Sequence, residues 1–335
     1  MLRRLISISG LILGAVVLTV LIPAWLPVVI IIDALRVKWR FPLARLLLFG
    51  VCWAWLETVG VICSALLWIT GQSKNVPRHY ALQRWWADRL LRALKATCGF
   101  SVEVENIDAL QPGPVILLAR HASLADSLVS AYVVTTLAHM NPRFVLKREL
   151  LADPCLDVVG QRLPNHFLDR QATDSTPELE ALQGLVTDID ASTVGIIFPE
   201  GTRANHKKRT RALEKIATND SDRAVRLSEM RHLLPPRPAG AAAMLRGCTS
   251  ADVVVAWHVG FEGLDTFGGI LKAISSDMPP IRFHLRRVSR DVIPTASISN
   301  GDEFTRWLDD EWMRMDREVN DALSARNEMR RNHRG

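Results

Sequence analysis

The chain begins with a long apolar run that a water-soluble fold has little room to bury. From Leu5 through Ile32 it contains no ionisable side chain. At about 1.5 Å of helical rise per residue, this run exceeds the ~30 Å thickness of a bilayer's hydrocarbon core. Leu46 through Thr70 is a second such run, with Glu57 as its only acidic or basic residue. The two runs predict a membrane-embedded segment of two helices.

The first run predicts a retained anchor, because it leads into a basic linker and not into the small-residue cleavage site of a secretory signal. Pro23 and Pro27 each remove a helical hydrogen bond, which favours a bent or broken helix. A hairpin within one leaflet is therefore an alternative to a full crossing, and basic residues on both sides of the runs leave the topology open. A carboxylate facing lipid is costly, so we expect Glu57 to form a hydrogen bond inside the protein.

The net charge is +6 at pH 7, which suits either an anionic membrane surface or nucleic acid. Beside two apolar runs, membrane lipids are the expected partner and nucleic acid is not. The five cysteines are odd in number and show no metal-ligand or redox spacing. This pattern favours reduced thiols, and hence an inner or cytoplasmic membrane protein whose domain outside the apolar runs faces the cytosol.

The chain changes character after the apolar runs. We expect a membrane anchor at 1–75, an amphipathic connector at 76–98 that contacts either the core or the membrane surface, an α/β domain at 99–325 and a polar, basic tail at 326–335. In the α/β domain short β-rich runs alternate with helical stretches, which predicts a mixed β-sheet flanked by helices. The expected strands are 101–104, 114–119, 143–146, 194–198, 252–257 and 281–288, and the expected helices are 124–138, 177–189, 220–231 and 302–323.

One histidine lies between an expected strand and an expected helix. His121 follows the strand at 114–119, and Asp126 comes five residues later. Neutral imidazole is a suitable general base, and a carboxylate on one ring nitrogen fixes its tautomer and orientation. The pair requires His121 to precede the helix, because residues five apart in a helix lie on different faces. Alternatively, Ser123 and Asp126 form a capping box, with Asp in place of Glu or Gln.

A second motif follows the expected strand at 194–198. Phe198 is followed by Pro-Glu-Gly-Thr and then Arg203, so backbone donors and a guanidinium come together at one turn. Such a turn suits a phosphate group, although an ordinary turn with a solvated arginine has the same composition.

The two motifs together resemble those of the glycerolipid acyltransferases, specifically the 1-acyl-sn-glycerol-3-phosphate acyltransferase type. His121 to Asp126 matches the family's His-x4-Asp block, and Phe198 to Arg203 matches its Phe-Pro-Glu-Gly-Thr-Arg block without a change. Between them, Lys147-Arg-Glu-Leu and Phe167-Leu-Asp-Arg are similar to the family's second block and its lead-in. The chain departs from the pattern before Phe167, where the usual glycine is missing, and in the late strand, which lacks the usual proline.

The resemblance implies roles for particular residues. His121 is the expected base and Asp126 its orienting partner, and the remaining expected contacts are to the acceptor substrate. Those residues are Lys147, Phe167, Asp169, Arg170, Glu200, Gly201, Thr202 and Arg203. The segment from His232 to Arg237 is also similar to one in longer members, where Arg237 either approaches the head group or is a loop cation.

The remaining charged residues have no such pattern. The basic run at 207–211 either attracts anionic lipid or a phosphate-rich carrier, or is a solvated face. We interpret the other histidines as surface or packing residues: His79, His139, His166, His206, His232, His258 and His284.

The implied activity is transfer of a fatty acyl group from an acyl thioester to the free hydroxyl of 1-acyl-sn-glycerol 3-phosphate, giving phosphatidic acid. The donor is acyl-CoA or acyl carrier protein, with no other cofactor and no metal. Alternatives are another lipid acceptor, such as glycerol 3-phosphate, another lysophospholipid or a lipid-linked amino acid, and a non-catalytic lipid-binding protein. A lipid hydrolase is less consistent with the sequence, which has no Gly-x-Ser-x-Gly elbow.

Overall fold

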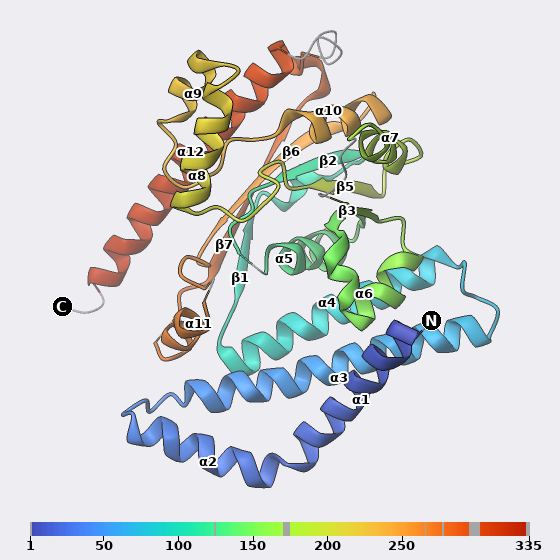
Figure 1. Ribbon diagram of the computed structural model, residues 1–335, viewed down its shortest axis with the longest axis vertical. Helices are drawn as coiled ribbons and strands as arrows, with labels where there is room; N and C mark the ends of the chain where they lie inside the picture. The colour runs from blue at the N-terminus through green and yellow to red at the C-terminus, as the bar shows by residue number, and fades with distance from the viewer. Residues whose placement is uncertain are drawn as a thin grey trace. The chain divides into compact units, whose positions relative to one another are not determined.

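The computed structural model describes residues 2–123, 125–169, 175–264, 266–276, 278–294 and 302–332. The chain divides into two compact units, each built from three separate segments. Figure 1 labels the helices and strands. The first unit comprises Met1–Glu103, Ser127–Ala172 and Gly263–Ile281, and the second comprises Val104–Asp126, Thr173–Glu262 and Arg282–Gly335. The fold is α/β with a mixed sheet flanked by helices, as the sequence predicts.

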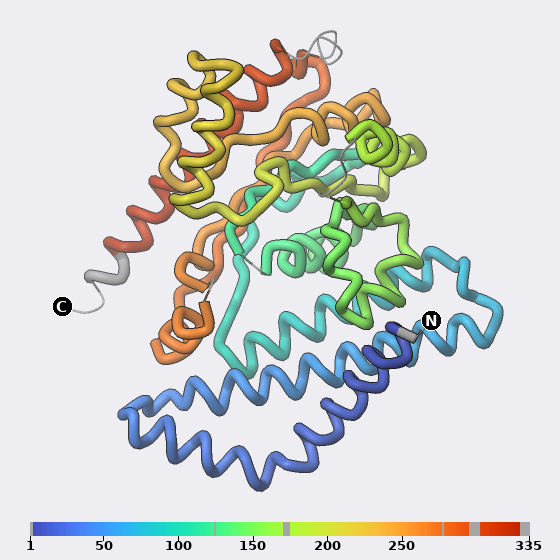
Figure 2. The backbone as a smooth tube through the Cα atoms, in the orientation of Figure 1, coloured from blue at the N-terminus to red at the C-terminus, as the bar shows by residue number. Residues whose placement is uncertain are grey.

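The first unit begins with four helices: α1 (Leu2–Val20), α2 (Ile22–Leu35), α3 (Pro42–Ile69) and α4 (Val76–Cys98). The expected break in the first apolar run is confirmed, because α1 and α2 separate at Leu21 and Pro23 lies in the first turn of α2. Asp33 then caps α3, since its Oδ2 accepts from the backbone N–H groups of Leu43 at 2.9 Å and Ala44 at 3.3 Å. Figure 2 follows the chain through these helices, in which α3 packs against α1, α2 and α4.

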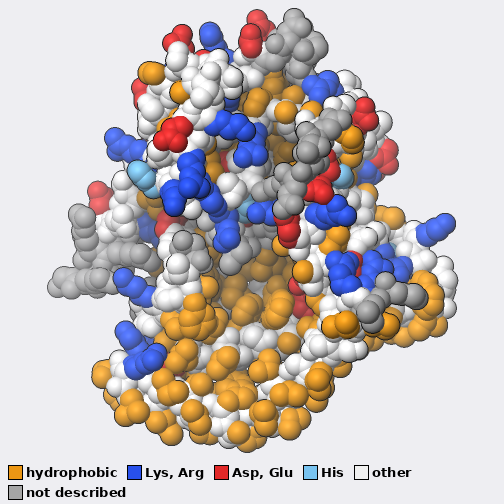
Figure 3. Space-filling view, in the orientation of Figure 1, with side chains coloured by type: hydrophobic (Ala, Val, Ile, Leu, Met, Phe, Trp, Pro, Cys, Tyr) orange, Lys and Arg blue, Asp and Glu red, His pale blue; other side chains and the backbone are white. Residues whose placement is uncertain are grey.

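Hydrophobic side chains gather on the surface of α1, α2 and α3 (Figure 3). Leu13 is 64% exposed, Val28 54% and Leu66 55%. Two helices, Arg3–Val20 and Pro42–Ile69, are long and apolar enough to cross a membrane. Water-exposed apolar surface of this extent is unfavourable, so these helices indicate membrane association.

Inside the first unit, the one carboxylate of α3 is buried. Trp86 of α4 donates its indole N–H to Glu57 Oε1 at 3.1 Å, which confirms the expected hydrogen bond. The start of α1 is tied to α6 (Pro154–Val158) by Arg4, whose Nε donates to Asp157 Oδ2 at 2.9 Å. Polar contacts therefore join the apolar helices to the rest of this unit.

The first unit also contains a short parallel strand pair, β3 (Asn141–Lys147) and β4 (His166–Leu168). The expected helix at 124–138 is shorter, because α5 (Asp126–Tyr132) gives way to a π-helical turn at Val133–Leu137. Helix α11 (Phe267–Ile274) packs against α3. Short 3-10 turns lie at Arg148–Ala152 and Gly160–Arg162.

The second unit is built on neighbouring strands in the order β1-β7-β6-β2-β5. Their bounds are β1 (Val102–Glu105), β2 (Val115–Ala119), β5 (Thr193–Ile197), β6 (Asp252–Val259) and β7 (Ile281–Val288). Strand β2 pairs parallel with β5 and β6, whereas β6 pairs antiparallel with β7. Every residue of β2 and β5 is buried, which explains their continuous apolar sequences.

Helices flank this sheet. They are α7 (Thr176–Leu185), α8 (His206–Ala217), α9 (Ser221–Leu227), α10 (Pro238–Gly247) and α12 (Asp302–Asn332), with 3-10 turns at Ile107–Leu110 and Arg290–Val292. Helix α10 packs against β2 and β5, and α12 packs against β6. Along α12 the buried Phe304, Leu308 and Trp312 recur every four residues, which places one face of this helix in the core.

Candidate active site

His121 lies in the loop between β2 and α5. The backbone N–H of Arg120 still bonds to Ala256 O of β6 at 2.9 Å, so the sheet holds the chain up to the residue before the histidine. The ring of His121 packs against Phe198, with centroids 4.9 Å apart, and its side chain is 15% exposed. The imidazole is thus held by the sheet while one side remains accessible.

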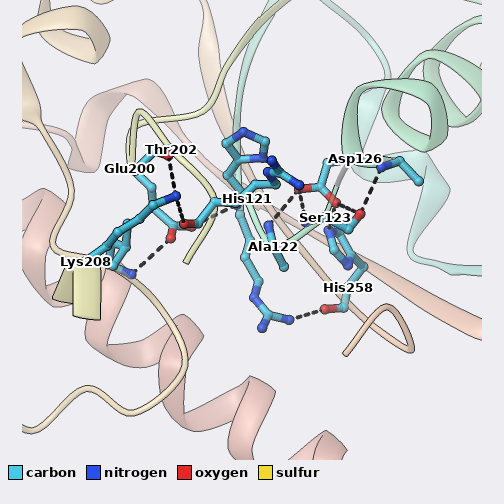
Figure 4. Close-up of polar contacts among 12 residues, drawn as sticks. His121, Ala122, Ser123, Asp126, Glu200, Thr202, Lys208 and His258 are labelled. Carbon is cyan, nitrogen blue, oxygen red and sulfur yellow. Dashed lines mark hydrogen bonds and ion pairs between the residues drawn. The ribbon is translucent and has the colours of Figure 1, made fainter. Parts of the chain in front are cut away.

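Asp126 binds the imidazole of His121. The distance from His121 Nδ1 to Asp126 Oδ2 is 2.8 Å (Figure 4). The same oxygen accepts from the backbone N–H of Ala122 at 2.6 Å and of Ser123 at 2.8 Å, and Ser123 Oγ donates to Oδ1. The capping-type bonds expected as an alternative therefore coexist with the His–Asp contact, and the tight loop that they form turns His121 toward Asp126.

The charge of Asp126 follows from its neighbours. Burial acts to raise the pKa of this carboxyl, but His258, His121 and Ser123 outweigh burial and hold the pKa well below its usual range. An ionised carboxylate only accepts hydrogen bonds. Nδ1 of His121 is therefore the donor, and in the neutral ring the lone pair lies on Nε2, where a base must have it.

The turn after β5 is fastened to the same loop. Glu200 is 2% exposed, and its Oε1 accepts from the backbone N–H of His121 at 2.8 Å. Its Oε2 accepts from the N–H of Leu234 at 3.0 Å. Burial raises the pKa of Glu200 to about 8, although the two N–H donors and Arg120 act to lower it. In return, the N–H of Ala204 donates to His121 O at 2.9 Å.

Cationic side chains surround this turn. Gly201 has φ of +68°, a conformation that favours glycine, and a Cβ at this position would lie 3.4 Å from the guanidinium carbon of Arg237. Lys208 of α8 donates from Nζ to Thr202 Oγ1 at 2.9 Å and to Arg203 O at 3.1 Å. The backbone N–H of Arg237 also bonds to Pro199 O at 2.9 Å. Positive charge from three segments therefore lies at one turn.

Comparison with known proteins gives a family match for part of the chain. The family model described as Acyltransferase matches residues 101–259, a span that includes His121, Asp126 and the Phe198–Arg203 turn. Residues 101–259 belong to the acyltransferase family. Among solved structures, one similar chain is the 1-acyl-sn-glycerophosphate (LPA) acyltransferase PlsC from Thermotoga maritima, at 17% sequence identity and a TM-score of 0.43. That match covers 79% of this chain and 95% of the other, and no curated protein sequence matches the chain.

The dyad and the Phe198–Arg203 turn belong to the second unit. Lys147, Phe167 and Asp169 belong to the first unit, where Lys147 ends β3, Phe167 lies in β4 and Asp169 follows β4. Asp169 Oδ2 there accepts from Arg148 Nη1 at 2.7 Å. Arg170 lies outside the described residues. Contacts of these four residues with the acceptor remain predictions.

The structure corrects our interpretation of one histidine. His258 in β6 is not an unpartnered packing residue, because its Nε2 lies 3.0 Å from Asp126 Oδ1 (Figure 4). No local spacing in the sequence predicts this contact, because Asp126 and His258 are 132 positions apart. The parallel pairing of β2 with β6 brings the two residues together. Because β2 and β6 are parallel, with Ala119 opposite Ala256, their carboxyl-terminal ends lie at the same edge of the sheet.

Proposed function

We propose that this acyltransferase moves a fatty acyl group from an acyl thioester to the free hydroxyl of 1-acyl-sn-glycerol 3-phosphate. The observation that carries the proposal is the pair of hydrogen bonds that joins the main chain of His121 to the turn. The N–H of His121 binds Glu200, and the N–H of Ala204 binds His121 O. These bonds hold the base, which acts on the hydroxyl, close to the cations, which bind the phosphate. Both can therefore act on the same acceptor molecule.

The proposed chemistry is a direct transfer. Nε2 of His121 takes the proton of the acceptor hydroxyl while the hydroxyl oxygen attacks the thioester carbonyl. The resulting tetrahedral oxyanion collapses, the carbon–sulfur bond breaks, and the thiolate leaves with the proton from the imidazolium. The products are phosphatidic acid and a free thiol, and no covalent enzyme intermediate is needed.

The cationic turn supports a phosphorylated acceptor. Guanidinium groups match phosphate oxygens with two parallel hydrogen bonds. Arg203 belongs to the turn itself, and Arg237 is exposed beside Gly201. Two membrane-length helices in the same chain support a lipid substrate that stays in the bilayer. We also propose that membrane lipids are partners, that the catalytic side faces the cytosol of an inner or cytoplasmic membrane, and that the donor is acyl-CoA or acyl carrier protein.

The test uses the purified full-length protein, a radiolabelled acyl donor offered as coenzyme A or carrier-protein thioester, and a panel of acceptors. The panel contains 1-acyl-sn-glycerol 3-phosphate, glycerol 3-phosphate, lysophosphatidylcholine and a lipid-linked amino acid. We expect labelled phosphatidic acid as the dominant product, and no such product from His121→Ala. Dominant labelling of another acceptor, or a fully active His121→Ala enzyme, would contradict the proposal.

A further inference from the structure

His258 is placed beside the dyad by sheet geometry. Strand β6 runs parallel to β2 with Ala119 level with Ala256, and side chains two apart on a strand share one face. The ring therefore emerges on the Ala256 face, just past the end of β2. Its exposure is 2%. The general-base chemistry described above does not use this histidine.

Aromatic rings fix the orientation of this imidazole. Phe283 of β7 stacks on it at 6.1 Å between centroids and 19° between planes, and Phe261 meets it edge-on at 5.1 Å and 81°. Arg120 Nη1 donates to the carbonyl oxygen of His258 and so fixes its main chain. Within the described chain, neither ring nitrogen makes a well-aligned hydrogen bond, so the 3.0 Å contact with Asp126 is the close polar contact of this ring.

We propose that His258 is a positioning residue whose Nε2, in close contact with Oδ1 of Asp126, holds Oδ2 of that carboxylate against His121. This inference rests on the proposed role of His121 as the base. Each carboxylate oxygen then has its own imidazole, with His121 on Oδ2 at 2.8 Å and His258 on Oδ1 at 3.0 Å. Asp126 cannot rotate without losing one of them.

The proton on Nε2 of His258 follows from the chemistry of its partner. Asp126 is buried and ionised, so it offers only lone pairs. A ring nitrogen 3.0 Å from such an oxygen is stable there only as a donor, because two facing lone pairs repel each other. Among the described residues, Arg120 bonds to the carbonyl oxygen of His258, and Glu262 Oε1 lies 3.5 Å from Arg120 Nη1.

Sharing Asp126 has a consequence for the base. A donor on Oδ1 withdraws part of the negative charge that otherwise stabilises protonated His121. Removal of that donor leaves more of the charge for His121, which then holds its proton to higher pH. His258 thus shares the charge of Asp126 with His121 and keeps the carboxylate aligned. A merely packing residue would do neither.

The test compares two variants that distinguish the effect of the N–H donor of His258 from the effect of its ring. His258→Gln keeps an N–H donor near the Nε2 position, and His258→Leu removes it while filling most of the space. For His258→Leu we expect kcat to fall roughly tenfold or more, the factor of a hydrogen bond to a charged group, with little change in acceptor KM. The acid limb of the pH profile for kcat/KM should move to higher pH. His258→Gln should keep both the rate and the limb close to wild type.

The matched control is His284→Leu in β7. His284 also contacts a carboxylate, since its Nδ1 lies 3.1 Å from Glu105 Oε2, but this pair does not include Asp126. We expect its acid limb to stay at the wild-type pH. Should His258→Leu show no cooperative melting transition, His258→Asn replaces it, because the shorter amide withdraws the donor from Asp126.

A second measurement separates this inference from the proposed function. Diethyl pyrocarbonate modifies neutral imidazoles, and peptide mass spectrometry reports the modification of His121 alone across a range of pH without any acyl transfer. In His258→Leu the onset of modification should move to higher pH, whereas His258→Gln should match wild type. An unshifted onset together with a wild-type kcat in His258→Leu would overturn the inference, as would a His258→Gln enzyme that behaves like His258→Leu. Absence of acyl transfer in the wild-type protein would instead contradict the proposed function, with the His121 modification still reporting on His258.

Discussion

The carboxylate of Glu200 is bonded to the main chain of His121, with 2.8 Å between Oε1 and the backbone nitrogen. Glu200 belongs to the turn that the sequence assigns to acceptor binding, yet both its oxygens accept backbone N–H groups, from His121 and from Leu234. We infer that Glu200 acts on the reaction through the position of the histidine, while its neighbours in the turn provide charge for the acceptor.

Glu200→Gln is expected to reduce both activity and stability. The amide oxygen still accepts one N–H, but the amide nitrogen cannot accept the other, so one buried donor is left unpaired at a cost of about 1–3 kcal/mol. Melting temperature and kcat measured on the same preparation test this. Glu214→Gln on the exposed face of α8 is the control, and it should match wild type in both measurements.

The pH dependence of that stability difference has a definite sign. Burial raises the pKa of Glu200 from the ordinary 4.5 to about 8, so folding favours the protonated form. The contribution of Glu200 to stability is full below pH 4.5 and is lost as the pH rises through about 8. The melting temperature of wild type relative to Glu200→Gln should therefore fall between pH 5 and pH 9. A constant or rising difference would contradict this assignment.

Asp126→Asn is expected to abolish most of the activity while preserving the fold's shape. The N–H groups of Ala122 and Ser123 keep the amide oxygen at the Oδ2 position beside His121, so the neutral side chain no longer stabilises the imidazolium that forms in the reaction. In a serine protease the equivalent exchange lowers kcat by about 10⁴, and we expect at least a 100-fold loss here. The pKa of Asp126 is held low, so its stability contribution is lost only in acid and the difference from wild type should stay constant between pH 5 and 9. Asp222→Asn, exposed on α9, is the matched control.

Arg203→Ala should weaken binding of the acceptor substrate far more than binding of the acyl donor. A charge-assisted hydrogen bond is worth about 1.5–3 kcal/mol, so acceptor KM should rise roughly 10-fold to 100-fold with donor KM little changed. Steady-state kinetics with each substrate varied in turn provides the test. Arg211→Ala on the exposed face of α8 removes the same charge away from the turn and should leave both values near wild type. An effect confined to donor KM would contradict a contact between Arg203 and the acceptor phosphate.

Gly201→Ala should distort the turn. Its φ of +68° costs an L-residue about 1–2 kcal/mol, and the added Cβ would lie 3.4 Å from the Arg237 guanidinium. We expect a lower melting temperature and a higher acceptor KM. Gly184→Ala within α7 is the contrasting control, because nothing lies within 4 Å and the backbone is helical. That exchange should stabilise the protein by about 0.5–1 kcal/mol, and equal effects at both glycines would argue against a strained turn.

The sequence predicted the strands of the second unit because strands that are buried on both faces have continuous apolar sequences. It also predicted the dyad, since His121 and Asp126 are separated by one tight loop. It missed β4, which has only three residues, and α8, whose lysines and arginines mask its helical spacing. His258 was misinterpreted because its partner is distant in the chain, and strand register is a property of the whole sheet.

The two hydrogen bonds between the His121 loop and the 200–204 turn have a practical consequence. The N–H of Ala204 bonds to the main-chain oxygen of His121, and the N–H of His121 bonds to the side chain of Glu200, so exchanging the other side chains of this turn leaves both bonds in place. Head-group preference should thus be open to redesign through Thr202, Arg203 and Arg237, one side chain at a time, with the proton-accepting nitrogen staying where it is.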